Sequence, residues 1–137
     1  MSMRKSSFLV IMVLMVTSCV GSNLTRAGIG SILINGLVVT NTTEEHVYSF
    51  LLMVEKVKEM VSVSPILAKA SFTTNFPLRK YKGNRISVTW THRGRNWESG
   101  SLIVKPTKDL VAGRPVAVEI VLGEHGHVST GMIQTGN

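Results

Sequence analysis

The chain of 137 residues is poor in the groups that build cross-links and many catalytic centres: it has one cysteine, Cys19, and one aspartate, Asp109. A single cysteine excludes an internal disulfide. A single aspartate leaves little from which to assemble a Ser-His-Asp triad, and no Gly-x-Ser-x-Gly motif occurs. The length allows one domain whose core can hold together without cross-links. We therefore expect one domain and no enzymatic activity.

Acidic residues are also few. The chain has 15 Lys and Arg against 8 Asp and Glu, and from Cys19 onward the ratio is 13 to 8. This excess favours anionic partners in general. It does not indicate nucleic acid, because a zinc-finger spacing, a basic helix and an RNP-like motif are all missing from the sequence.

No apolar run is long enough to cross a membrane. Residues 8–20 offer 13 residues, or roughly 20 Å of helix, against a hydrocarbon core of about 30 Å. The run follows Arg4 and Lys5 and ends at the small residues Thr17 and Ser18. A short basic start, an apolar stretch and a small-residue ending are typical of an export signal.

The end of this leader, Val16-Thr17-Ser18-Cys19, resembles the lipobox of bacterial lipoproteins, in which an aliphatic residue and two small ones precede a cysteine. The resemblance implies cleavage after Ser18, a lipid on Cys19 and stable anchoring by two or more acyl chains. Val20 is not the aspartate that commonly retains enteric lipoproteins at the inner membrane. The resemblance therefore implies that the protein is anchored on the periplasmic side of the outer membrane in a Gram-negative bacterium. The alternative is an ordinary cleaved signal that leaves Cys19 as a free thiol.

Three regions follow from this interpretation. Residues 1–18 are the signal peptide, residues 19–30 are the lipidated N-terminus and a flexible tether, and residues 31–137 are the domain. The tether is small, polar and glycine-containing. Ten extended residues reach about 35 Å, so the domain can stand clear of the lipid headgroups.

The domain reads as a series of short strands rich in β-branched residues, separated by turn residues. Alternation is clearest at 85–91, where Ile86, Val88 and Trp90 share a face, and this run forms a hairpin with 96–105. Pro77 and Pro106 are expected to end their strands. The other predicted strands are 32–40, 71–76, 116–122 and 127–133.

Residues 42–63 fit two structures. Thr42 and Glu45 could form a capping box before an apolar helical face, which would give an α+β domain with one helix at 43–62. The same stretch also fits two strands, 47–54 and 60–63, around a polar Glu55-Lys56 turn. We favour the strands, because they complete the seven or eight of an antiparallel β-sandwich. That pattern resembles the immunoglobulin-like domains of small bacterial lipoproteins, with Trp90, Phe72, Phe76, Val88 and Ile120 replacing the usual disulfide as the link between sheets.

Basic and aromatic residues alternate in two neighbouring stretches. Cations attract phosphate or carboxylate, and flat rings stack on sugars or bases, so together they suit an anionic polymer or glycan. The alternative is that these are solvated loop tips that protect strand edges from pairing with other chains. The candidate patch consists of Arg79, Lys80, Tyr81, Lys82, Arg85, Arg93, Arg95 and Trp97.

Metal and cofactor sites are not indicated. His125 and His127 share a turn, but a zinc site needs a third protein ligand. Gly28-Ile-Gly30 lacks the third glycine of a dinucleotide loop. We therefore expect a cell-envelope lipoprotein, anchored through Cys19, that acts as an interaction or assembly module for an envelope protein or anionic polymer. The alternative function is a lipid-anchored inhibitor or immunity protein against an envelope enzyme or toxin.

Overall fold

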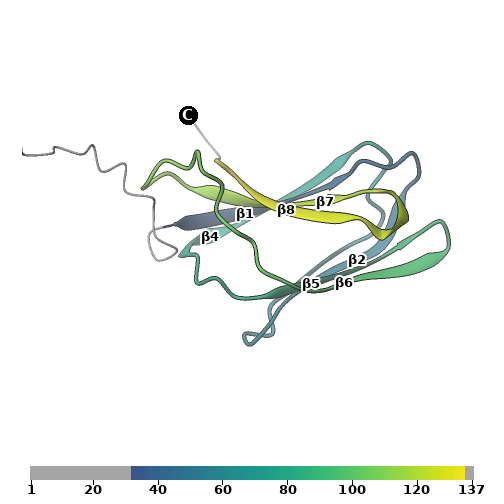
Figure 1. Ribbon diagram of the computed structural model, residues 1–137, viewed down its shortest axis with the longest axis horizontal. Helices are drawn as coiled ribbons and strands as arrows, with labels where there is room; N and C mark the ends of the chain where they lie inside the picture. Colours follow the sequence, from purple (N-terminus) through teal and green to yellow (C-terminus); the bar gives the residue numbers. More distant parts are fainter. Residues whose placement is uncertain (1–31, 135–137) are drawn as a thin grey trace, which may run out of the picture.

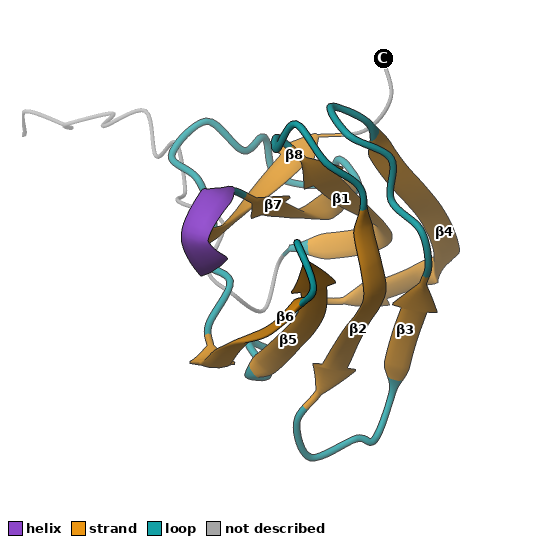
Figure 2. Ribbon diagram, turned by 90° about the vertical axis from the view of Figure 1, so that its right-hand side faces the viewer, coloured by secondary structure: helices purple, strands orange, loops and turns teal. Residues whose placement is uncertain are grey.

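The computed structural model describes residues 32–134, which form two four-stranded sheets packed face to face (Figures 1 and 2). The predicted signal peptide, Cys19 and the tether lie outside the described residues. The predicted β-sandwich is confirmed. The strands are β1 Leu33–Asn41, β2 Val47–Val54, β3 Met60–Val63, β4 Ser71–Lys80, β5 Ile86–His92, β6 Arg95–Leu102, β7 Val116–Leu122 and β8 Val128–Gln134, and a 3-10 turn, η2, covers Glu124–Gly126.

The strand order is β4-β1-β7-β8 in the first sheet and β3-β2-β5-β6 in the second. Five pairs are antiparallel and one, β1 with β7, is parallel. An immunoglobulin constant domain pairs its first strand with its second. Here β1 pairs with β4 and β7 instead, so neighbours in sequence share a sheet only in the hairpins β2–β3, β5–β6 and β7–β8.

The ambiguous segment forms the two favoured strands at the predicted bounds, and the alternative helix at 43–62 is absent. A register shift between Tyr48 and Leu51, with a positive φ of 50° at Ser49, places Val47, Phe50 and Leu52 all in the core. Val47 and Phe50 are among the apolar positions that also fit a helical face. Pairing with β5, which sets Leu52 against Val88, determines the structure instead.

Pro77 does not end its strand, contrary to the sequence prediction, because β4 continues to Lys80. β4 lies at the edge of its sheet, and its pairing with β1 shifts register between Ile34 and Gly36, opposite Pro77. A proline is tolerated at an edge or bulge, where its missing N–H leaves no ladder bond unmade. The second predicted proline stop also differs, since β6 ends at Leu102, before Pro106.

The core lies between the sheets. Trp90, Val88 and Ile120 are almost fully buried, and Phe72 and Phe76 are half-buried against them, as predicted. All described strand pairs and core residues fall between Ile32 and Gln134. Within residues 32–134 these side chains form one continuous core. No helix in this range is long and apolar enough to span a membrane.

One buried polar side chain holds the loops at one end of the sandwich together. Asn41, with no exposed surface, donates from Nδ2 to the carbonyl oxygens of Glu45 at 2.8 Å, Ile66 at 3.1 Å and Leu67 at 3.2 Å. Its Oδ1 accepts from the N–H and hydroxyl of Thr43 at 3.0 and 2.7 Å. The β1–β2 and β3–β4 loops are thereby joined through one amide.

Replacing Asn41 with alanine should lower the free energy of unfolding by about 2–4 kcal/mol, because buried carbonyls then lose their donor. Urea denaturation monitored by tryptophan fluorescence measures this change. Asn96→Ala, at an exposed position on β6, is the control and should cost less than about 0.5 kcal/mol. Equal effects of the two substitutions would contradict the assigned role of Asn41.

Candidate binding site at the basal end

The sandwich has two ends of different character. We call the end where β1 begins the basal end; it carries residues 55–59, 81–85 and 103–115. Backbone bonds link these parts, from the N–H of Tyr81 to Ile32 at 2.8 Å and from the N–H of Glu55 to Arg85 at 2.8 Å. The distal end carries residues 42–46, 64–70, 93–94 and 123–127. In Figure 1 the basal end lies on the left and the distal end on the right.

The predicted basic patch is divided between these ends, contrary to the expectation of one surface. Arg79, Lys80, Lys82 and Arg85 lie at the basal end, whereas Arg93, Arg95 and Trp97 lie at the distal end. β5 runs between the two groups, and its 7 residues span roughly 20 Å at about 3.3 Å per residue. The two sets of cations cannot contact one small ligand together.

Tyr81 is also not an exposed stacking platform. Its side chain is buried, and its hydroxyl donates to the carbonyl oxygen of Val104 in the loop after β6. Burial raises the pKa of Tyr81 above its ordinary value of 10.0. The ring therefore ties the loop after β4 to the loop after β6.

Trp97 is half-buried and packs against the β7–β8 turn. The Cα of Gly126 sits so close to its ring that an added Cβ would lie 2.2 Å from Cε3, and the Arg95 guanidinium lies 5.2 Å from the ring centroid. This packing fixes the β7–β8 turn against β6. It leaves Trp97 a structural role at the distal end.

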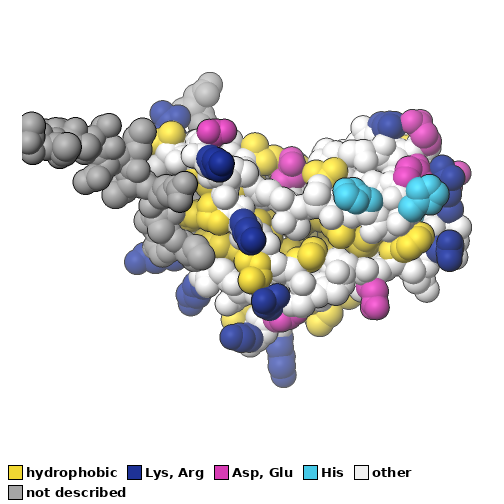
Figure 3. All heavy atoms as spheres, viewed as in Figure 1, with side chains coloured by type: hydrophobic (Ala, Val, Ile, Leu, Met, Phe, Trp, Pro, Cys, Tyr) yellow, Lys and Arg dark blue, Asp and Glu magenta, His cyan; other side chains and the backbone are white. Residues whose placement is uncertain are grey.

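Two of the three distal cations are paired with carboxylates. Lys69 lies 3.0 Å from Glu44, and Arg93 lies 3.7 Å from Glu45 and 3.4 Å from Glu124. Figure 3 shows this mixture of dark blue and magenta at the right-hand end. With Arg95 at the start of β6, the distal end thus carries three cations and three carboxylates.

The basal end has a large excess of cations. Nine exposed Lys and Arg side chains lie there against three carboxylates, Glu55, Glu59 and Asp109. Arg79 is the only one of the nine that forms an ion pair in the part of the chain that the structure describes. Figure 3 shows the dark blue side chains spread over this end. The nine are Lys56, Lys58, Arg79, Lys80, Lys82, Arg85, Lys105, Lys108 and Arg114.

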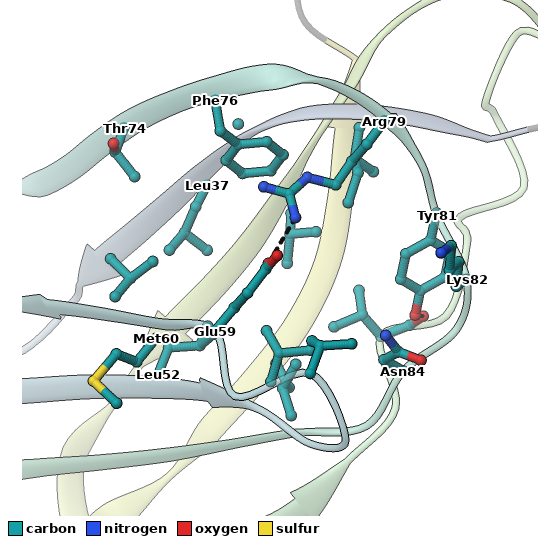
Figure 4. A pocket seen from close by; sticks show the side chains of 18 of the residues that line it. Leu37, Leu52, Glu59, Met60, Thr74, Phe76, Arg79, Tyr81, Lys82 and Asn84 are labelled. Atoms are coloured by element: carbon teal, nitrogen blue, oxygen red, sulfur yellow. Dashed lines mark hydrogen bonds and ion pairs between the residues drawn. The ribbon is translucent and has the colours of Figure 1, made fainter.

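A cleft of about 570 Å³ opens between the two sheets at this end, along the edge formed by β3 and β4 (Figure 4). Its volume is in the range of small-molecule sites, about 300–1,000 Å³. Apolar side chains from both sheets form its walls. They are Ile34, Leu37, Leu52, Val54, Val61, Phe76, Ile86, Val104 and Val118.

An ion pair spans the mouth of this cleft. Arg79, near the end of β4, contacts Glu59, just before β3, at 2.6 Å, and its guanidinium lies 4.7 Å from the centroid of the Phe76 ring (Figure 4). Lys80 and Lys82 also line the cleft. Each joins no ion pair within residues 32–134. The site thus combines apolar walls with a cationic rim.

The apolar walls and the cationic rim are suited to binding a ligand. Within residues 32–134 no group of three or more His, Cys, Asp or Glu could hold a metal ion. His125 and His127 lie in the β7–β8 turn, far along the sandwich from the cleft. Sequence reasoning included three lining cations of the rim but missed Glu59 and the apolar walls, which come from strands distant in sequence.

Comparisons with known proteins add little. No protein family and no curated protein matches the chain. An NMR structure of a protein from Eubacterium rectale is similar, with a TM-score of 0.45, 14% sequence identity, and coverage of 79% of this chain and 93% of that one.

Tyr81→Phe should change how stability depends on pH. Because the folded-state pKa is raised, the tyrosine stabilises the fold fully below about pH 10 and loses that contribution as the pH rises further. We expect wild type to lose more stability than Tyr81→Phe between pH 9 and pH 11 (roughly the range over which phenols titrate) in urea denaturation. Tyr48→Phe, at a half-exposed position, should retain the wild-type alkaline loss. Parallel profiles for wild type and Tyr81→Phe would contradict the assignment.

Proposed function

We propose that this chain is a non-enzymatic lipoprotein of the cell envelope, in which a β-sandwich acts as a binding module for an anionic partner. The partner is an envelope polymer or an acidic surface of an envelope protein. The observation that carries the proposal is the set of unpaired cations at the basal end. Eight of nine lack a carboxylate partner within the described range, so their field is available to an anionic ligand.

The predicted anchor at Cys19 also favours the basal end as the binding surface. Ile32, the first described residue, is bonded to Tyr81 among the basal loops. A fully extended chain from Cys19 to Ile32 reaches about 45 Å, so a lipid on Cys19 would keep the start of the domain within that distance of the membrane surface. A partner held there lies close to the membrane, as expected on the periplasmic side of the outer membrane.

The lipid anchor is tested by Cys19→Ser. Wild type should fractionate with membranes and give a mature N-terminal peptide whose mass includes the diacylglyceryl group, because the thioether forms on the Cys19 sulfur. The variant should lack that mass and leave the membrane fraction. Continued membrane fractionation of Cys19→Ser, with no change in fatty-acid labelling, would eliminate the lipid anchor from the proposal.

The basal surface is tested by neutralisation. Lys80→Gln, Lys82→Gln and Arg85→Gln together should weaken retention on purified peptidoglycan at least about tenfold, with a shallower salt dependence, because three charges no longer interact with the polymer. The control is Lys69→Gln, Arg93→Gln and Arg95→Gln, which removes the same charge from the distal end. Thermal melting checks that both variants are folded. Equal loss of retention in the two triples would contradict a basal site.

A further inference from the structure

The walls of the cleft and its rim present two different chemistries within one site. The deep residues Leu52, Ile86 and Val104 are buried and apolar. At the mouth, Val57 and Met60 are 49% and 60% exposed, although both are apolar. Exposed apolar side chains that continue into an apolar cleft mark a surface for an apolar ligand.

The rim selects the charge of that ligand. Arg79, Lys80 and Lys82 line the cleft, and Glu59 is the one carboxylate among its lining residues. Glu59 already neutralises Arg79, which leaves the two lysines without a counter-ion in residues 32–134. Lys80 and Lys82 are exposed, and two such cations beside an apolar opening attract an anionic head group.

The ion pair between Arg79 and Glu59 at the mouth of the cleft can separate when a ligand binds. Arg79 and Glu59 are exposed at 43% and 53% of their side-chain surface. Pairs this exposed contribute little to stability, so separating them costs little. Arg79 could then contact an anionic head group while its ring partner, Phe76, stays in the wall. Only the side chains of this ion pair then need to move, and the strands around the cleft keep their positions.

We infer that the cleft binds the acyl chain of an anionic amphiphile, with Lys80, Lys82 and Arg79 holding its phosphate or carboxylate head. The inference rests on the proposed function, since the rim belongs to the same set of basal cations, and it adds an amphiphile to the anionic ligands of that end. The chain lies between the two sheets, entering at the β3–β4 edge beside Val57 and Met60. The head stays at the basal rim, on the side where the tether joins.

Isothermal titration calorimetry with monomeric alkyl phosphates tests the inference on residues 20–137, which contain every described core residue and lack Cys19, with thermal melting to check that this chain is folded. Each additional methylene of the alkyl chain should tighten binding about fourfold until the cleft is filled, so decyl phosphate should bind about fifteenfold more tightly than octyl phosphate. Inorganic phosphate, which offers the head alone, and dodecyl maltoside, which offers a chain on a neutral head, should both bind more weakly than dodecyl phosphate. Equal affinities for octyl, decyl and inorganic phosphate would overturn the inference.

Paired variants locate the ligand. Thr74→Trp should fill the cleft and weaken dodecyl phosphate binding at least about tenfold, whereas Thr73→Trp, at the exposed preceding position of β4, should leave it unchanged. If Thr74→Trp does not fold, Val57→Ser with Met60→Ser at the exposed mouth replaces it, with the same expected direction. Wild-type affinity in the folded cleft variant would overturn the inference.

The head group is tested by Lys80→Gln with Lys82→Gln. This pair should reduce the affinity for dodecyl phosphate to about that for dodecyl maltoside, and Lys105→Gln with Lys108→Gln, basal but outside the cleft, should have a small effect. Retention on peptidoglycan is measured on the same samples. If amphiphile binding fails while basal neutralisation still reduces retention, the cleft inference falls and the proposed function stands; if both fail, both fall.

Discussion

The central position of β1 determines the arrangement of the two ends. β1 pairs with β4 on one side and, in parallel, with β7 on the other, so its first residue lies beside the end of β4 and the start of β7. Sequential strands then alternate in direction. The loops after β2, β4 and β6 therefore gather where the chain enters the domain, and the remaining loops gather at the opposite end.

The two ends are stabilised by different interactions. At the distal end the buried amide of Asn41, the packing of Gly126 on Trp97 and exposed ion pairs close the sandwich. At the basal end Tyr81 closes one side, while the β3–β4 edge stays apart and exposes the cleft. Like charges crowded at this end repel one another, which opposes compactness. An anionic ligand would relieve that repulsion, so the feature that weakens the free domain is the one that favours binding.

The sequence was sufficient for most of the strands but not for the site. Period-2 alternation located 116–122, and β propensity located 47–54 and 60–63, at the bounds of β7, β2 and β3. The prediction that Pro77 ends its strand was wrong, because the sequence does not tell whether a strand lies at the edge of a sheet. The basic patch was misplaced because residues 79–85 and 93–97 are close in sequence but lie at opposite ends of β5. Alternating strand direction would have grouped 79–85 with 55–59 and 103–115. The cleft depends on how far β3 and β4 stand apart, which no local pattern encodes.

We propose that the basal end, and not the distal end, contacts the anionic partner. Amide hydrogen exchange on residues 20–137, with and without soluble peptidoglycan fragments, tests it most directly, because exchange reports protection loop by loop. We expect slower exchange at 55–59 and 81–85 when the fragments bind, and no change at 42–46 and 64–70. Protection confined to the distal loops would contradict it.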